Sequence, residues 1–233
     1  MRKIIFIVLS LLMASAVVYA AIFALSDTLH VQLGKYTFNI PKQYSQEGAL
    51  PHWLIITPGL DDGSKDYLLR FPAKEIVAAI PGYKEMDGRY TEDITAILAV
   101  LTSVEVKRYE DSERYRDLWN ATGSYLERIV ELYTHKPWFK IYRKIEYPNS
   151  WAVVSQSPEN GALLPKDTLD FWVAHCLSGN SPLTKSGEIA ICDSYVFYED
   201  IVIDFSVSEQ NLDVINDVRS YLKNTIENWR VAE

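Results

Sequence analysis

A long apolar run at the N-terminus sets the limits for the rest of the chain. Arg2 and Lys3 precede a stretch without charged residues from Ile4 to Leu25, and no later segment approaches this length of apolar sequence. As a helix, the run would reach about 33 Å, which is enough to cross a hydrocarbon core of ~30 Å. Because the positive-inside rule keeps the flanking charges in the cytoplasm, we predict that the remainder of the chain is exported.

The leader is consistent with an uncleaved anchor or with a signal peptide. Val18-Tyr19-Ala20 has the small or modest residues of a cleavage site, whereas the apolar run continues from Ala21 to Leu25, as an anchor requires. The anchor is the favoured interpretation. No cysteine comes just after the leader, so lipid attachment of the bacterial lipoprotein kind is excluded. We therefore predict a single-pass inner-membrane protein with its C-terminal domain in the periplasm, or a soluble periplasmic protein after cleavage near Ala20.

The exported portion, residues 26–233, is long enough for one large domain or two small ones. A single domain is favoured, because no repeat or long linker divides it. The whole chain has 23 basic and 31 acidic residues and a net charge of −8, and without the leader, residues 1–25, it becomes more negative. Nucleic acid is excluded as a partner, because binding a polyanion requires clustered basic residues. The charge favours a protein partner with a basic surface.

Two cysteines in an exported chain predict a disulfide. Cys176 lies near the end of an expected strand at 169–177, and Cys192 ends a second at 188–192, with a polar loop between them. A bridge would close this hairpin. A reactive thiol with His175 as its base is disfavoured, because neighbouring residues in a strand point to opposite faces. Buried free thiols are the other alternative.

Patterns of period two predict that most of the exported portion is β-strand. A hairpin is expected first, with its turn at Gly34, between strands at 29–33 and 36–41. Further strands are expected at 52–57, 66–71, 126–134, 139–147, 151–156 and 195–205, the last of which turns at Glu199-Asp200. The predicted fold class is α+β, an antiparallel bent sheet with a few packing helices, preceded by one N-terminal transmembrane or signal helix.

Helices are expected after Pro72, from about residue 111 to Gly123, and at the C-terminus. Ser206 and Glu209 have the spacing of a capping box for the C-terminal helix. Its apolar residues step by three or four along one face and are predicted to be core, namely Leu212, Ile215, Val218, Leu222, Ile226 and Trp229. The stretch 93–108 fits a helix and a strand, and we expect a strand in its second half.

The sequence has no recognisable catalytic motif. It contains no GxSxG, phosphate-binding GxxxxGK, GxGxxG, HExxH or CxxC pattern. The four histidines lack the spacing of metal ligands, and the acidic loop at 61–66 lacks the alternating carboxylates of a calcium site. We therefore predict a protein without metal or cofactor that is not an enzyme, although carboxylates from distant strands could still form a hydrolytic site.

Three segments that are expected to be exposed loops contain acidic or aromatic residues, namely 61–66, 135–138 and 198–200. Aromatic side chains anchor protein interfaces, and acidic side chains attract a basic partner. Solvated turns of no special function are the alternative. The predicted partner-binding residues in these loops are Asp61, Asp62, Asp66, Trp138, Glu199 and Asp200.

The chain as a whole resembles the periplasmic or membrane-anchored immunity proteins encoded beside antibacterial toxins of type VI secretion systems. The resemblance is carried by LGKYTFNIPKQY after the leader, RKIEYPNSWAVVSQSP, WVAHCL and the closing amphipathic helix. It implies a non-enzymatic envelope protein that protects its own cell by plugging the active cleft of a toxin, such as a lipase or wall hydrolase, delivered into the periplasm. An accessory or sensory subunit of a cell-envelope complex is the first alternative, and an envelope hydrolase is the second.

Overall fold

The computed structural model describes residues 27–45, 66–85, 93–110, 113–134, 138–155, 171–178 and 190–231. The leader, the strand expected at 52–57, and the predicted site residues Asp61 and Asp62 lie outside these ranges. Within them, all strand pairs are antiparallel and a few helices pack on the sheet. The predicted α+β class with an antiparallel sheet is therefore confirmed for the described part of the chain.

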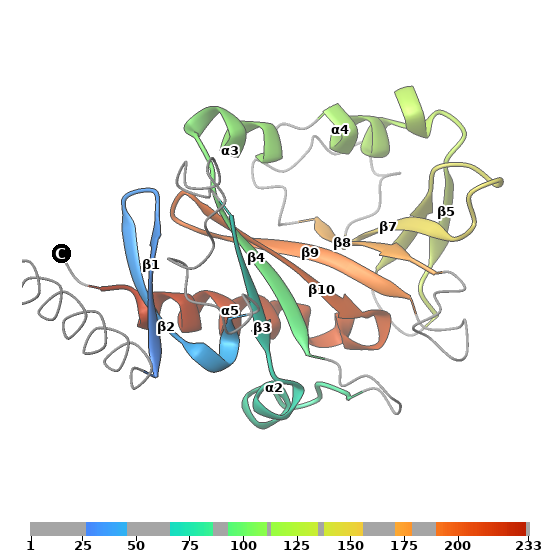
Figure 1. Ribbon diagram of the computed structural model, residues 1–233. Coiled ribbons are helices and arrows are strands. Elements are labelled where there is room, and N and C mark those ends of the chain that lie inside the picture. Colours follow the sequence, from blue (N-terminus) through green and yellow to red (C-terminus); the bar gives the residue numbers. More distant parts are fainter. Residues whose placement is uncertain are drawn as a thin grey trace, which may run out of the picture.

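The described strands form two sheets (Figure 1). A two-stranded hairpin contains β1 (Thr28–Leu33) and β2 (Tyr36–Pro41), as predicted. The other sheet has the order β3-β4-β10-β9-β8-β7-β6-β5. Its strands are β3 (Asp66–Phe71), β4 (Ile94–Val100), β5 (Ile129–Leu132), β6 (Phe139–Tyr142), β7 (Ser150–Val154), β8 (Trp172–Leu177), β9 (Ile191–Tyr198) and β10 (Ile201–Ser208).

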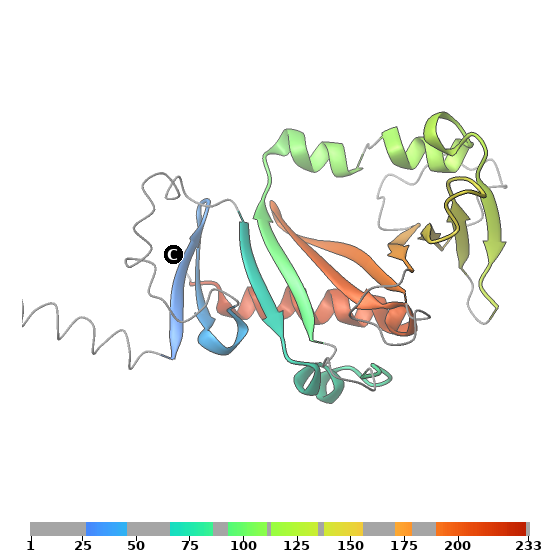
Figure 2. The same ribbon diagram turned by 45° about the vertical axis from the view of Figure 1, so that its right-hand side comes forward.

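Helices lie on both sides of the large sheet (Figures 1 and 2). They are α2 (Ala73–Ala79), α3 (Ser103–Glu110), α4 (Glu113–Asn120) and α5 (Ile215–Trp229), with short 3-10 helices η1 (Lys42–Tyr44), η3 (Gly123–Tyr125) and η6 (Glu209–Val214). α5 packs on one face of the central strands and α4 on the other. No helix among the described ranges has both the length and the apolar character needed to cross a membrane.

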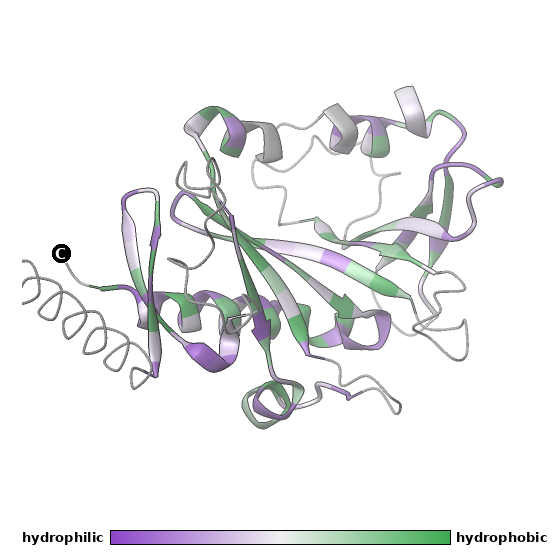
Figure 3. Cartoon of the chain, in the orientation of Figure 1, coloured by the Kyte–Doolittle hydropathy of each residue, from purple (hydrophilic) through white to green (hydrophobic). Residues whose placement is uncertain are grey.

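The central strand β10 is covered by α5 on one face and by α4 on the other. Ile201 and Ile203 belong to the core on the α5 side, whereas Val202 belongs to the core beneath α4. All three are buried, so this part of the strand is apolar on both faces, whereas alternation returns at Asp204, which is exposed. Colouring by hydropathy shows the same concentration of hydrophobic residues in the central strands (Figure 3).

The apolar stripe predicted for the C-terminal helix is confirmed as core. Its members from Leu212 to Ile226 are buried, and Trp229 stacks on Phe71 with 5.9 Å between ring centroids. The predicted capping box was wrong. β10 continues to Ser208, and Ser206 Oγ donates a hydrogen bond to Asp193 instead of capping a helix.

The prediction for residues 93–108 was also wrong, because the strand comes first and the helix second. β4 buries Ile94, Ala96 and Leu98 on one face, which is strand alternation. Thr102 then caps α3. Its Oγ1 accepts from the Glu105 N–H at 3.3 Å, and the Glu105 carboxylate accepts from the Thr102 N–H at 2.8 Å, which is a capping box. This Thr-x-x-Glu spacing is visible in the sequence and outweighs the β-branched residues beside it.

Candidate protein-binding surface

The strand registers define two ends of the large sheet. Because neighbouring strands are antiparallel, β5, β7 and β9 begin where β6, β8 and β10 end. One row across the sheet contains Ile129, Tyr142, Trp151, Cys176 and Cys192. The end of the sheet just beyond this row is termed the basal end. The opposite end, where β9 turns into β10, is termed the apical end.

The four predicted site residues that the structure describes all lie toward the apical end. Asp66 is the exposed first residue of β3, and Glu199 and Asp200 form the turn between β9 and β10, as expected from the sequence. Trp138 precedes β6, is half-buried, and packs edge-on against Tyr133 with 6.4 Å between ring centroids. Trp138 therefore contributes to the core as well as to the surface.

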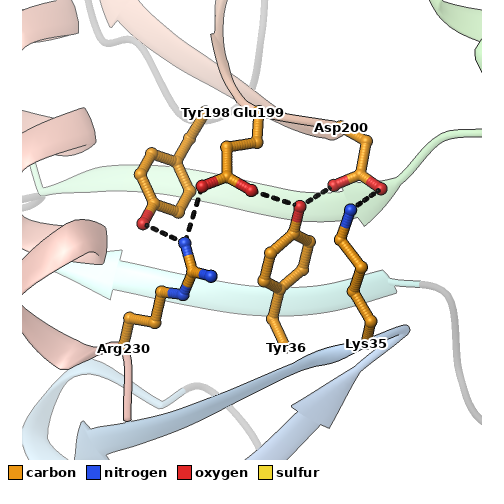
Figure 4. A network of polar contacts seen from close by, with 6 residues as sticks. All are labelled: Lys35, Tyr36, Tyr198, Glu199, Asp200 and Arg230. Atoms are coloured by element: carbon orange, nitrogen blue, oxygen red, sulfur yellow. Dashed lines mark hydrogen bonds and ion pairs between the residues drawn. The ribbon is translucent and has the colours of Figure 1, made fainter. Parts of the chain in front are cut away.

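Glu199 and Asp200 belong to a network that joins three elements (Figure 4). The Tyr36 hydroxyl donates to Glu199 Oε2 at 2.6 Å and also to Asp200. Lys35 Nζ lies 3.3 Å from Asp200 Oδ2, and Arg230 Nη1 donates to Glu199 Oε1 at 2.6 Å. The network is termed the polar latch and consists of Lys35, Tyr36, Tyr198, Glu199, Asp200 and Arg230.

The polar latch stabilises its own charges. A hydrogen bond from Tyr36 and another from Arg230 lower the pKa of Glu199. Burial alone would raise the pKa of Asp200, but hydrogen bonds from Tyr36 and Lys35 outweigh it and lower the pKa. Burial, followed by these carboxylates, raises the pKa of Tyr36 to about 12. These acids hold the β1–β2 hairpin and the end of α5 against the sheet, so partner binding through Glu199 and Asp200 would have to compete with these contacts.

A different feature, missed in the sequence, marks the basal end. Large apolar side chains are exposed there on connections and at strand ends, and the two most exposed in the described ranges are Ile145 at 73% and Leu126 at 71%. These side chains are termed the basal rim, namely Leu126, Ile145, Tyr147, Leu177 and Ile191. Single exposed apolar residues are ordinary on protein surfaces, whereas a collection of them is typical of interaction sites.

An ion pair and backbone pairings connect the segments of the basal rim. The ion pair between Glu127 and Lys144, with 3.0 Å between Oε2 and Nζ, brings the segment around Leu126 beside the segment around Ile145. The Ser150 N–H donates to the Tyr147 carbonyl at 3.3 Å. Ser150 is the cross-strand partner of Leu177, and Leu177 is the partner of Ile191. These contacts bring the segments that carry the rim residues together at the basal end, with polar residues among them.

The strand predicted at 139–147 would place Ile145 and Tyr147 on its apolar face. β6 instead ends at Tyr142, and the chain turns before Pro148. The Pro148-Asn149 dipeptide was a turn signal, but alternation alone could not show that the strand stops before Ile145. Their exposure is thus a result of where the turn falls.

The predicted disulfide is confirmed. Cys176 of β8 and Cys192 of β9 are directly opposite in the ladder, with 4.0 Å between Cα atoms, and both are fully buried. One detail differs from the prediction. β9 begins at Ile191, so Cys192 lies at the start of a strand that runs to Tyr198 and not at the end of a short one.

A serine, a histidine and an aspartate lie on adjacent strands beside the rim. Ser150 Oγ is 2.9 Å from His175 Nε2, and His175 pairs across the ladder with Asp193. An acyl-transfer site also needs backbone N–H groups free to stabilise an oxyanion near the serine. The Ser150 N–H donates to the Tyr147 carbonyl, and Asp193 accepts from Ser206 at 2.7 Å. The arrangement is better explained as surface hydrogen bonding than as catalysis.

Within the described ranges, no group of three or more His, Cys, Asp or Glu side chains is placed to hold a metal ion.

Comparisons with known proteins give one similarity to a solved structure. No family model and no curated protein matches the chain. Among solved structures, the chain is similar to an immunity protein of the Stenotrophomonas maltophilia type IV secretion system, with a TM-score of 0.47 and 11% sequence identity. The alignment covers 88% of this chain and 94% of that protein. A similarity this low carries no argument about function, which must rest on the chain's own residues.

Proposed function

We propose that this chain is a non-enzymatic envelope protein that binds a partner protein and neutralises it, as an immunity protein does with an antibacterial toxin. The basal rim carries the proposal. Its five apolar side chains are exposed together, and covering them with a partner's apolar surface would be favourable. Polar and charged residues such as Glu127, Lys144 and Ser150 lie beside them, which is the composition of a protein interface.

Location in the envelope is supported by the leader and by the disulfide. The leader has the length and flanking charges of an inner-membrane anchor. A disulfide persists in the oxidising periplasm, whereas cytosolic thiols are kept reduced. In this proposal residues 1–25 anchor the chain and residues 26–233 lie in the periplasm. A soluble periplasmic form after cleavage near Ala20 would serve the same function.

The partner is proposed to be a toxin with a basic surface that acts in the periplasm. The net charge of −8 supports a basic partner, because opposite charges increase the rate of encounter. The proposal covers the binding of the toxin and does not specify the secretion system that delivers it. The resemblance in the sequence points to type VI secretion, whereas the structural neighbour serves a type IV system.

The test begins with the native host. The chain, tagged after Glu233, is purified from the envelope, and the bound protein is identified by mass spectrometry. We expect the product of an adjacent toxin gene, bound 1:1 with a Kd below about 1 μM. A toxin-free gene neighbourhood, or a purified toxin that does not bind, would refute the proposal.

Variants then test the surface. Ile145→Asp and Leu177→Asp each place a charge in the basal rim, and each should weaken toxin binding by about 30-fold or more, as expected for an interface hot spot. Val104→Asp is the matched control, because Val104 is also an exposed apolar residue but lies on α3, outside the rim. Equal affinities for all three variants would rule out the rim as the interface.

A further inference from the structure

The disulfide lies next to the basal rim. Leu177 follows Cys176, and Ile191 precedes Cys192, so the bridge is one residue away from both apolar side chains. Leu177 and Ile191 are cross-strand partners. In the described ranges the β8–β9 ladder has three residue pairs in register, and the bridged pair is the middle one. The covalent bond therefore fixes the two strands where they present this part of the rim.

The other end of the β8–β9 pair is held by different contacts. Ser194 Oγ of β9 donates to the Val173 carbonyl of β8 at 2.8 Å. Arg219 of α5 donates to the same carbonyl and to Ser194 Oγ, each at 2.9 Å. These buried hydrogen bonds do not need the disulfide. At the basal end, Leu177 is also paired with Ser150 of β7, and Ile191 with Ser208 of β10. Loss of the bridge is therefore expected to loosen β8 against β9 at this end, while the contacts of Val173 and Ser194 stay in place.

We propose that formation of the Cys176–Cys192 bridge is what makes the basal rim competent to bind the partner, so that binding begins only after export. This inference rests on the proposed function, because it concerns the regulation of the same surface. In the reduced chain, the pairing of β8 with β9 loosens at the basal end, and the Leu177–Ile191 pair is no longer fixed by a covalent bond beside it. A cytosolic precursor is then unable to engage a toxin, and the exported, oxidised chain is able to do so.

The chemistry is ordinary thiol–disulfide exchange. Two S–H bonds of the chain are lost and one S–S bond forms, while an exported thiol oxidant that carries a reactive disulfide takes up the two electrons and two protons as a dithiol. Both cysteines are fully buried in the folded chain. A reductant cannot reach them without local opening, so the bridge acts once, during folding, and not as a reversible switch.

The experiment compares the oxidised chain with the Cys176→Ala/Cys192→Ala variant by amide hydrogen exchange and by titration with the purified toxin. In the variant, amides at 175–177 and 191–193 should exchange at least about tenfold faster, while those of the β9–β10 ladder toward the turn stay protected. Toxin affinity should fall at least about tenfold. Ile76→Ala is the control, because Ile76 is a buried residue of α2, outside β8 and β9, and its loss destabilises the fold.

Each outcome separates the two proposals. Unchanged exchange at 175–177 and 191–193, or equal toxin affinity of the variant and the oxidised chain, would overturn the inference and leave the proposed function intact. An equal loss of affinity in Ile76→Ala would attribute the effect to global stability and would also overturn it. If the oxidised wild-type chain does not bind the toxin, the proposed function fails, and this inference fails with it.

Discussion

Reduction of the Cys176–Cys192 bridge should lower the free energy of unfolding by about 3 kcal/mol. The two cysteines are 16 residues apart, and the chain-entropy model gives about this value for a loop of that size at 25 °C. This value counts only the greater freedom of the unfolded chain after reduction. Loosening of the β8–β9 ladder beside the two buried cysteines would add to the loss.

The measurement is urea unfolding followed by tryptophan fluorescence, with and without a phosphine reductant present throughout. With a urea m-value of about 2 kcal/mol/M, the midpoint should fall by about 1.5 M on reduction. The Cys176→Ala/Cys192→Ala variant is the control and should not respond to the reductant. A decrease below about 1 kcal/mol in the wild type would refute the loop-entropy reasoning.

Three further predictions follow from contacts elsewhere in the fold. In the polar latch, folding lowers the pKa of Glu199 and Asp200 below their ordinary values of 4.5 and 3.8, so these acids stabilise the folded state at higher pH and lose this effect as the pH falls. The pKa of Tyr36 is raised to about 12, so its contribution to stability is lost as the pH rises from 10 toward 12. Unfolding free energies from pH 3 to 11 should therefore vary less in Tyr36→Phe, and identical profiles would contradict this. Arg219→Ala removes the donor to two buried carbonyls of β8 and should lower the free energy of unfolding by about 3 kcal/mol or more. A decrease below about 1 kcal/mol in urea unfolding would contradict this. Gly34→Ala should lower the free energy of unfolding by about 1–2 kcal/mol in the same assay, because Gly34 has φ +58° and an added Cβ would lie 3.1 Å from Val100 Cγ1. An unchanged urea midpoint would contradict this.

Elements with a strong local signal could be predicted from the sequence. Gly34 between two alternating segments specified the β1–β2 hairpin, and the spacing of apolar residues specified the buried face of α5. The turn at Glu199-Asp200 was also predicted correctly, and Glu199 has a positive φ of 54° there. In each case the physical cause lies within a few neighbouring residues, which is why the pattern was sufficient.

The strand order could not be predicted in the same way. β4 lies between β3 and β10, and the pairing of Ile97 with Asp204 joins residues that are more than one hundred positions apart. Such pairing depends on packing between whole elements and has no periodic signature in either strand.

The candidate site shows the same limit. The acids at Glu199 and Asp200 were predicted to be exposed in a turn, but the sequence could not show that Tyr36 and Arg230 would contact them. The basal rim was missed because its members come from four separate connections and strand ends, and only the fold brings them together.

Protection of a sensitive cell tests the central claim most directly. The toxin identified in the native host is directed to the periplasm of a sensitive strain that also expresses either the wild-type chain or Leu177→Asp, with equal envelope levels verified by immunoblot. The account predicts survival with the wild type and loss of viability with the variant, whereas Val104→Asp should protect. Death of the cells that express the wild type, or full protection by Leu177→Asp, would contradict it.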